Sequence, residues 1–211
     1  MGRPPYAQAS IESYLGKLAS ADPEPGGGSV AALVGALGAG LVTMVCDLTL
    51  GKEKFASVED SIAEIKEQSE TLRGELTGFI TADAEAYAQV AAAMKLPRDT
   101  DAQKKERTRV MQAALKGAAD VPLKVAEAAA AVARLSLPAA EQGNPNAVSD
   151  AGVAVVLADA AAQSAALNVK INLAWIEDDT FKRDAWTRIE AVHSETARQR
   201  DIVLALTYSK I

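Results

Sequence analysis

Histidine and cysteine are almost missing from this sequence of 211 residues, which contains one of each, His193 and Cys46. A zinc site built from several His and Cys ligands is therefore impossible within one chain, and a disulfide framework and a Cys-x-x-Cys redox motif are excluded as well. Aromatic residues are also scarce, at 4%. If the protein is an enzyme, we expect no metal, and we expect its proton-transfer groups to be carboxylates, lysines or a tyrosine.

Positive charge is in deficit too, with 22 Lys and Arg against 28 Asp and Glu, a formal net charge of −6 and a pI of about 5.0. Nucleic-acid binding needs a basic surface, so no nucleic-acid partner is expected. Residues 1–10 lack the apolar core of a signal peptide. The most membrane-like stretch, Val30–Leu50, is rich in Gly and Ala and contains Asp47, which favours a buried helix. We therefore expect a cytoplasmic protein with no membrane partner.

Helix-forming sequence, in contrast, is abundant. No run alternates β-branched and polar residues, so no strand is predicted. The length suits one domain over residues 1–211, and we predict an all-α fold, an elongated bundle of about five to seven helices. The expected helices are Ser10–Ala19, Val30–Leu50 after an N-cap at Ser29, Ser57–Leu96, a segment from Asp101 to Pro138 that Pro122 kinks or restarts, Asp150–Trp175 after an N-cap at Ser149, and Asp179–Ser209.

Two features concern packing and assembly. Gly35, Gly38 and Gly40 lie inside the helix Val30–Leu50, where each costs about 1 kcal/mol relative to Ala, which indicates that another backbone packs very close. A continuous helix over Ser57–Leu96 would be about 60 Å long, whereas a compact domain of this size has a radius of gyration of about 17 Å. Either this helix bends, or the bundle is elongated and pairs with another copy; we favour a homodimer.

A glycine loop precedes one helix and is the first candidate binding element. Gly26, Gly27 and Gly28 are followed by Ser29, and unpaired backbone N–H groups at a helix start favour anions. No Lys follows in the position that a P-loop requires. A flexible turn is the equally weighted alternative.

Asp83 is the candidate acid or base. Phe79, Asp83 and Tyr87 are four residues apart and share one helix face, so the carboxylate lies on or near a packed surface. Such a carboxylate must be hydrogen-bonded or have a shifted pKa. The alternative is an ordinary solvated carboxylate, as we expect for Glu85.

Further polar residues are candidates for binding. Asn168 and Asn172 continue a stripe from Ser164 along a helix of Ala, Val and Leu, and either a ligand or interhelix hydrogen bonds would satisfy them. Asp150 lies at the start of the same helix. Lys52, just past a helix end, is either a solvated cation or a clamp for a carboxylate.

In combination these segments resemble the cyclodeaminase/cyclohydrolase family, which includes the C-terminal domain of formiminotransferase-cyclodeaminase and free-standing methenyltetrahydrofolate cyclohydrolases. The similar strings occur in family order and cover nearly the whole chain. They are Pro25–Leu33, Met44–Thr49 with Gly51-Lys52, Ala82–Tyr87, Leu96-Pro97, Gly143-Asn144, Ser149–Ala154, and Ala166–Val169 with Ile171-Asn172.

The resemblance implies an all-α dimer with its active site in a groove near the subunit interface, a tetrahydrofolate substrate and no prosthetic group. Asp83 aligns with the aspartate regarded as catalytic, and the remaining implied site residues are Gly26, Gly27, Gly28, Ser29, Lys52, Tyr87, Asn144, Asp150, Asn168 and Asn172. Lys52 would pair with the anionic glutamate tail of folate. Tyr87, Phe55 and Trp175 are the candidates for stacking on the pterin.

Three functions follow as hypotheses. The first is a methenyltetrahydrofolate cyclohydrolase that makes N10-formyltetrahydrofolate. The second is a formiminotetrahydrofolate cyclodeaminase that releases ammonia. The third is a non-catalytic helical dimer that binds folate or a partner protein.

Overall fold

The computed structural model describes residues 6–211, all of them in helices or their connections, with no strand in that range. The first five residues of the predicted domain lie outside the described residues. Six α-helices are present: α1 (Ile11–Leu18), α2 (Gly27–Asp47), α3 (Glu59–Met94), α4 (Asp101–Gln142), α5 (Val148–Leu173) and α6 (Asp179–Lys210). The predicted all-α fold is confirmed.

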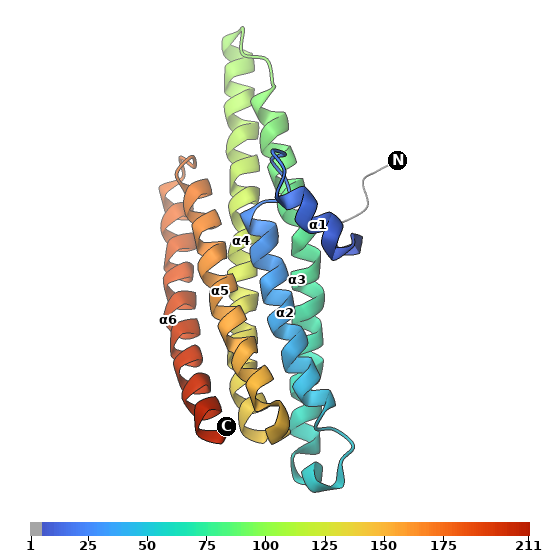
Figure 1. Ribbon diagram of the computed structural model, residues 1–211. Coiled ribbons are helices and arrows are strands. Elements are labelled where there is room, and N and C mark those ends of the chain that lie inside the picture. Colours follow the sequence, from blue (N-terminus) through green and yellow to red (C-terminus); the bar gives the residue numbers. More distant parts are fainter. Residues whose placement is uncertain (1–5) are drawn as a thin grey trace.

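The five long helices run nearly side by side and form an elongated bundle (Figure 1). Helix α2 contacts α3, α4 and α5, while α6 packs against α4 and α5. The short helix α1 lies across one side near the beginning of α2 (Figure 1). The hairpin of α3 and α4 extends beyond the other helices, as expected for helices of 36 and 42 residues, because 42 residues span about 63 Å.

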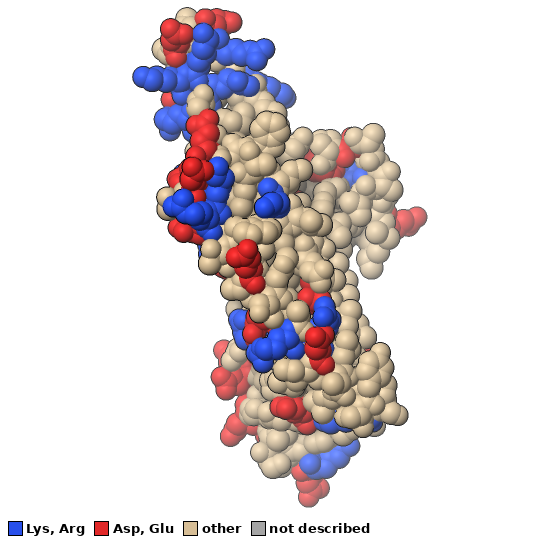
Figure 2. All heavy atoms as spheres, turned by 90° about the vertical axis from the view of Figure 1, so that its left-hand side faces the viewer, with Lys and Arg blue, Asp and Glu red and all other residues tan. Residues whose placement is uncertain are grey.

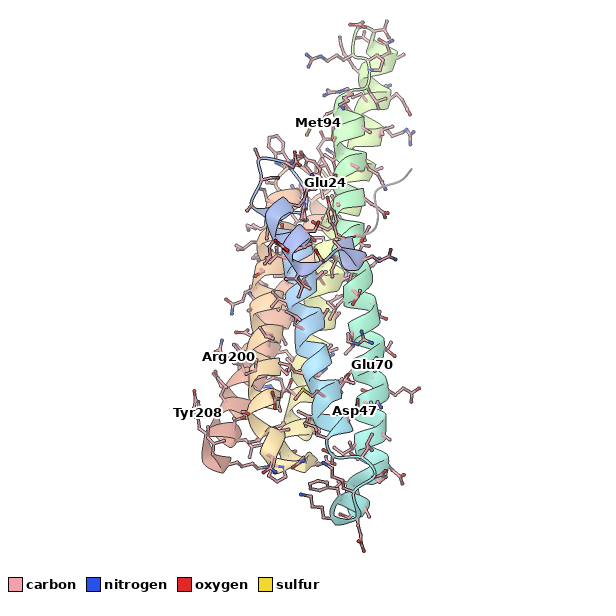
Figure 3. The ribbon with its side chains drawn as sticks, turned by 45° about the vertical axis from the view of Figure 1, so that its right-hand side comes forward. Glu24, Asp47, Glu70, Met94, Arg200 and Tyr208 are labelled. Atoms are coloured by element: carbon pink, nitrogen blue, oxygen red, sulfur yellow. The ribbon has the colours of Figure 1, made fainter. Side chains whose placement is uncertain are left out.

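The two ends of the bundle differ, and we call them the pocket end and the loop end. The pocket end contains the beginning of α2, the end of α3, the beginning of α4 and the end of α5. The loop end contains the end of α2, the 3₁₀ helix η2 (Glu53–Val58) and the α4–α5 connection. Figure 3 shows Glu24 and Met94 at the pocket end and Asp47 at the loop end. Helix α2 alone separates them by about 30 Å.

Close packing of α2 on its neighbours explains its glycines. A Cβ on Gly38 would lie 3.1 Å from the Ala154 carbonyl oxygen of α5, and a Cβ on Gly35 would lie 3.0 Å from a Leu76 methyl of α3. The prediction of close backbone packing is therefore confirmed at Gly38, whereas Gly35 makes room for a side chain of α3. At Gly40 the nearest atom is an Arg73 side-chain carbon 3.7 Å away, so there the glycine is not required by space.

Four predicted boundaries are wrong. Helix α2 begins at Gly27 after an N-cap at Gly26, so Ser29 lies inside the helix, and it ends at Asp47, three residues before the predicted Leu50. Helix α4 continues through Pro122 and ends at Gln142, beyond Pro138. Proline removes one helical hydrogen bond, but α3, α5 and α6 all pack on α4 and hold it in place. Helix α5 begins at Val148, so Ser149 is not its N-cap.

Two helical segments, Gly27–Asp47 and Pro145–Leu173, are long and apolar enough to cross a membrane by length and composition alone. In each segment, more than half of the apolar 18-residue stretch that meets this criterion is buried inside the bundle. The central helices of a bundle have the same property, because their residues are apolar on most sides.

Candidate functional site

A pocket of about 830 Å³ opens at the pocket end, between the loop before α2 and helices α3, α4 and α5. This volume is within the range of small-molecule sites. Its lining includes predicted site residues from three separate segments. They are Gly26 and Gly27 before and at the start of α2, Asp83 and Tyr87 on α3, and Asn168 and Asn172 on α5.

Asp83 is held against the beginning of α2. Its Oδ2 accepts a hydrogen bond of 3.0 Å from the Ser29 N–H, one of the unpaired amides of the first helical turn. A Cβ on Gly28 would lie only 2.1 Å from Asp83 Oδ1, so no other residue fits there without displacing the carboxylate. The triple glycine therefore allows α2 to approach α3 at this carboxylate, and Gly28 is the position where this approach is closest.

Burial raises the pKa of Asp83 above its ordinary value, and the hydrogen bond from Ser29 opposes that shift. No cation is among the causes of the shift. A half-buried carboxylate with a raised pKa, facing a pocket, can both accept and return a proton.

Ser29 also connects Asp83 to Tyr14 of α1, which the sequence analysis did not identify as a candidate. The Ser29 side chain is fully buried, and its Oγ lies 3.0 Å from the Tyr14 hydroxyl in a hydrogen bond. Burial raises the pKa of Tyr14, so it remains a neutral phenol. Helix α1 is thereby fixed against the same turn of α2 that holds Asp83.

The two asparagines combine both roles that the sequence left open. Asn168 Nδ2 donates to the Ser164 carbonyl, and Asn172 Nδ2 donates to the carbonyls of Asn168 and Ala118, each at 2.9 Å. Among the described residues nothing donates to either amide oxygen, so two acceptors remain at the pocket. Asn168 also packs on the glycine loop, since a Cβ on Gly27 would lie 3.3 Å from its Nδ2.

Two exposed aromatic side chains line the pocket, Tyr87 and Trp175. Trp175 is positioned by Gln112 of α4, whose Nε2 donates to the Trp175 carbonyl at 3.1 Å and whose Oε1 accepts from the Glu177 N–H at 2.9 Å. The third stacking candidate, Phe55, lies in η2 at the loop end. Gln112 was missed by the sequence analysis.

Three predicted site residues lie at the loop end and do not line this pocket in the single chain. Lys52 follows α2, and its ammonium donates to the Leu48 carbonyl. Asn144 is buried and joins the α4–α5 connection to the end of α2. Its Nδ2 donates to the Leu48 carbonyl at 3.0 Å. Asp150 lies in the first turn of α5.

Comparison with known proteins agrees with this geometry. Residues 10–191 match the sequence profile of the family described as formiminotransferase-cyclodeaminase. The chain is 43% identical over 202 residues to the methenyltetrahydrofolate cyclohydrolase of Methylorubrum extorquens, covering 96% of this chain and 97% of that protein. It is 34% identical over 196 residues to the formimidoyltransferase-cyclodeaminase of Rattus norvegicus, a longer protein of which the match covers 36%.

A solved structure has the same fold. The crystal structure of formiminotetrahydrofolate cyclodeaminase from Thermotoga maritima superposes with a TM-score of 0.86 at 30% sequence identity, covering 96% of this chain and 97% of that one. The relatives are thus named as enzymes of folate chemistry, of the cyclohydrolase and cyclodeaminase types. The chain belongs to the formiminotransferase-cyclodeaminase family.

Proposed function

We propose that this protein is a methenyltetrahydrofolate cyclohydrolase, which hydrolyses N5,N10-methenyltetrahydrofolate to N10-formyltetrahydrofolate. The observation that carries the proposal is the Asp83 carboxylate, half-buried at the pocket, hydrogen-bonded by the Ser29 amide and raised in pKa by burial. The 43% identity to a cyclohydrolase over nearly the full length of both chains supports the choice of reaction.

The reaction needs a base and a positioned water. The methenyl carbon is already electrophilic, so a carboxylate can activate the attacking water without a prosthetic group. Asp83 takes one proton from the water as the C–O bond forms. The C–N5 bond then breaks and N5 takes that proton from Asp83, which regenerates the carboxylate, while the second proton of the water leaves to solvent as the formyl C=O forms. The negative charge of Asp83 also lies favourably beside the cationic substrate.

The remaining pocket residues suit a pterin ring. The free amide oxygens of Asn168 and Asn172 can accept hydrogen bonds from pterin N–H groups. Tyr87 and Trp175 offer ring faces for stacking at the rim. Gly26 and Gly27 keep the loop backbone free of side chains where the ring would approach.

Two assays on the purified protein test the proposal. One follows the loss of methenyltetrahydrofolate absorbance, and hydrolysis well above the buffer rate is expected. The other follows methenyltetrahydrofolate formation and ammonia release from formiminotetrahydrofolate, the cyclodeaminase reaction named for the structural relative. Turnover only in the second assay would replace the proposed reaction with cyclodeamination. Tight folate binding with no turnover in either would leave a binding protein.

We also propose that two copies pair along the exposed apolar face of α1, α2 and α5. Ile11, Leu37, Met44 and Val153 are each between 43% and 79% exposed, and Ile11 and Leu37 line an apolar groove of about 640 Å³. Such a patch on a soluble protein marks an interaction surface. Analytical ultracentrifugation at micromolar concentration should give a dimer, and Leu37→Glu should give a monomer. A wild-type monomer would contradict the pairing.

A cytoplasmic location without a membrane or nucleic-acid partner completes the proposal. The burial of both membrane-length helices within the bundle and the net charge of −6 support it. Recovery of the expressed protein in the membrane fraction after lysis would contradict it.

A further inference from the structure

Arg107, a cation in the pocket wall, has hydrogen-bond donors without a partner among the described residues. Arg107 of α4 lines the pocket, and its Nη2 donates to the Met94 carbonyl at 3.3 Å. Its Nε is buried and has no hydrogen-bond partner among the described residues, and within the same residues Arg107 makes no ion pair. A guanidinium has five N–H donors in a planar fork, and a buried donor left unpaired is unfavourable.

The surroundings of Arg107 are basic in a protein that is otherwise acidic. Residues 95–109, at the tip of the α3–α4 hairpin, contain six Lys and Arg and three Asp and Glu. Two of the acids are already paired, Asp101 with Lys104 and Glu106 with Arg109. Figure 2 shows these cations gathered over the top of the molecule. The tip and the adjoining pocket wall therefore form a local positive field.

Two acidic residues besides Asp83 also line the pocket. Glu24 from the loop before α2 and Glu177 after α5 both line the pocket. Arg107 is the one Lys or Arg among the described residues that line the pocket, so an anionic group of a ligand is attracted toward it. Asp83 lies 11 residues before Met94 on α3, so the two pocket regions are about 16 Å apart along the helix, which suits an extended ligand with a cationic head and an anionic tail.

We propose that Arg107 binds the carboxylate tail of the folate, so that the glutamate end of the ligand lies under the α3–α4 tip. The proposal rests on the function proposed above and assigns the tail to the pocket end, away from Lys52. A carboxylate can accept two parallel N–H bonds from a guanidinium, and the Nη1 donors of Arg107 have no hydrogen-bond partner among the described residues.

Arg107→Gln tests this assignment, with Arg109→Gln as the matched control. Arg109 is two residues away and loses the same charge, but its guanidinium is paired with Glu106 and does not line the pocket. For methenyltetrahydrofolate we expect Arg107→Gln to raise KM by about tenfold with kcat nearly unchanged, since a charge-assisted bond is lost in ground and transition states alike. Arg109→Gln should leave both constants near wild type.

A ligand without the glutamate separates binding of the tail from a structural role of Arg107. For methenyltetrahydropteroate, which lacks the glutamate, Arg107→Gln and wild type should have the same KM. An equal rise in KM for both ligands, or no rise for either, would overturn the assignment. If the wild type hydrolyses neither ligand, the proposed reaction fails, and equilibrium binding of the 5-formyl forms of the same two ligands decides the tail site by the same comparison.

Discussion

At the pocket end of the bundle, polar atoms remain available after the fold has formed, whereas at the loop end the fold uses them. The amide N–H groups of Asn168 and Asn172 donate to carbonyls of the bundle, while their amide oxygens accept no hydrogen bond from the described residues and remain available at the pocket. Asn144 has no such surplus at the loop end, because its Oδ1 accepts from the Asn146 N–H and its Nδ2 donates to Leu48. The same residue type thus lines the pocket at one end and connects two structural elements at the other.

Charge follows the same division. The Asp83 carboxylate is half-buried with one backbone hydrogen bond and no cation among the causes of its raised pKa. Near the loop end, the exposed Asp47 has an ordinary ion pair with Lys66 at 2.6 Å. A carboxylate without a neutralising partner in a pocket is unfavourable for stability, and enzymes keep such groups where chemistry needs them. Substitutions at the two ends should therefore separate activity from stability.

Asp83→Asn should give the largest effect, a loss of kcat of about 10²- to 10⁴-fold, because the amide cannot accept the proton of the water. The control is Glu85→Gln, which removes an exposed carboxylate two residues away on the same helix and should leave kcat unchanged. Single-turnover hydrolysis measures both. Near wild-type turnover in Asp83→Asn would show that Asp83 is not the acid or base. The carboxylates at the two ends would then not differ in their importance for activity.

The pH dependence of Asp83 has a definite sign. Its pKa is raised, so kcat/KM should rise with pH along an acid limb that lies above the ordinary value of 3.8, and this limb should vanish in Asp83→Asn. A raised pKa in the folded state means that the protonated form contributes stability at low pH and that this contribution is lost as pH rises through the folded pKa. Asp83→Asn should therefore be at least as stable as wild type at pH 7, and a lower Tm there would contradict the burial argument.

Gly28→Ala should come next, with a loss of kcat of about 10²-fold, because its Cβ would lie 2.1 Å from Asp83 Oδ1 and the carboxylate would have to rotate away. Gly40→Ala in the same helix is the control, since its nearest neighbour is 3.7 Å away and helix propensity should improve. Steady-state kinetics and thermal unfolding on both variants distinguish displacement of Asp83 from a general loss of fold. Equal activity in the two variants would show that the approach of α2 to Asp83 is dispensable.

Asn144→Ala should act on stability and not on the site. Its Nδ2 joins the α4–α5 connection to the Leu48 carbonyl at the end of α2, and its Oδ1 accepts from the Asn146 N–H within the connection. The loss of both bonds should lower the free energy of unfolding by about 1–3 kcal/mol. Asn146→Ala, an exposed neighbour, should have little effect. Urea denaturation measures both. A wild-type stability combined with a raised KM would instead make Asn144 a ligand-binding residue, as the family resemblance implies.

The sequence predicts local features well and contacts across helices poorly. Helices α3 and α6 are predicted within two residues of their observed ends, because apolar spacing and a following proline are local signals. The beginning of α2 is missed by three residues, because the approach of Gly28 to Asp83 depends on the packing of α3. The persistence of α4 past Pro122 and Pro138 likewise depends on its neighbours.

The site shows the same limit. Spacing identifies Asp83 with Tyr87, and Asn168 with Asn172, since residues four apart share a helix face. The assignment of all of them to one pocket needs the fold. Arg107 was missed, although the short connection between α3 and α4 makes these helices antiparallel neighbours and sets Arg107 opposite Met94, where the hydrogen bond between them is found. Counting residues outward along both helices from that connection would have predicted that Arg107 faces Met94.

Lys52→Ala should have the smallest effect and gives the most direct test of the division between the ends. Lys52 lies at the loop end and already donates to the Leu48 carbonyl, so KM for methenyltetrahydrofolate should stay within about twofold of wild type, as for most exposed cations. Lys54→Ala, in the same connection, is the control for general charge. If Lys52→Ala alone raises KM, a second subunit must bring its loop end to this pocket, because about 30 Å of α2 separate the two within one chain. In that case the Leu37→Glu monomer would lose the same affinity, and Lys52→Ala would have no further effect in it.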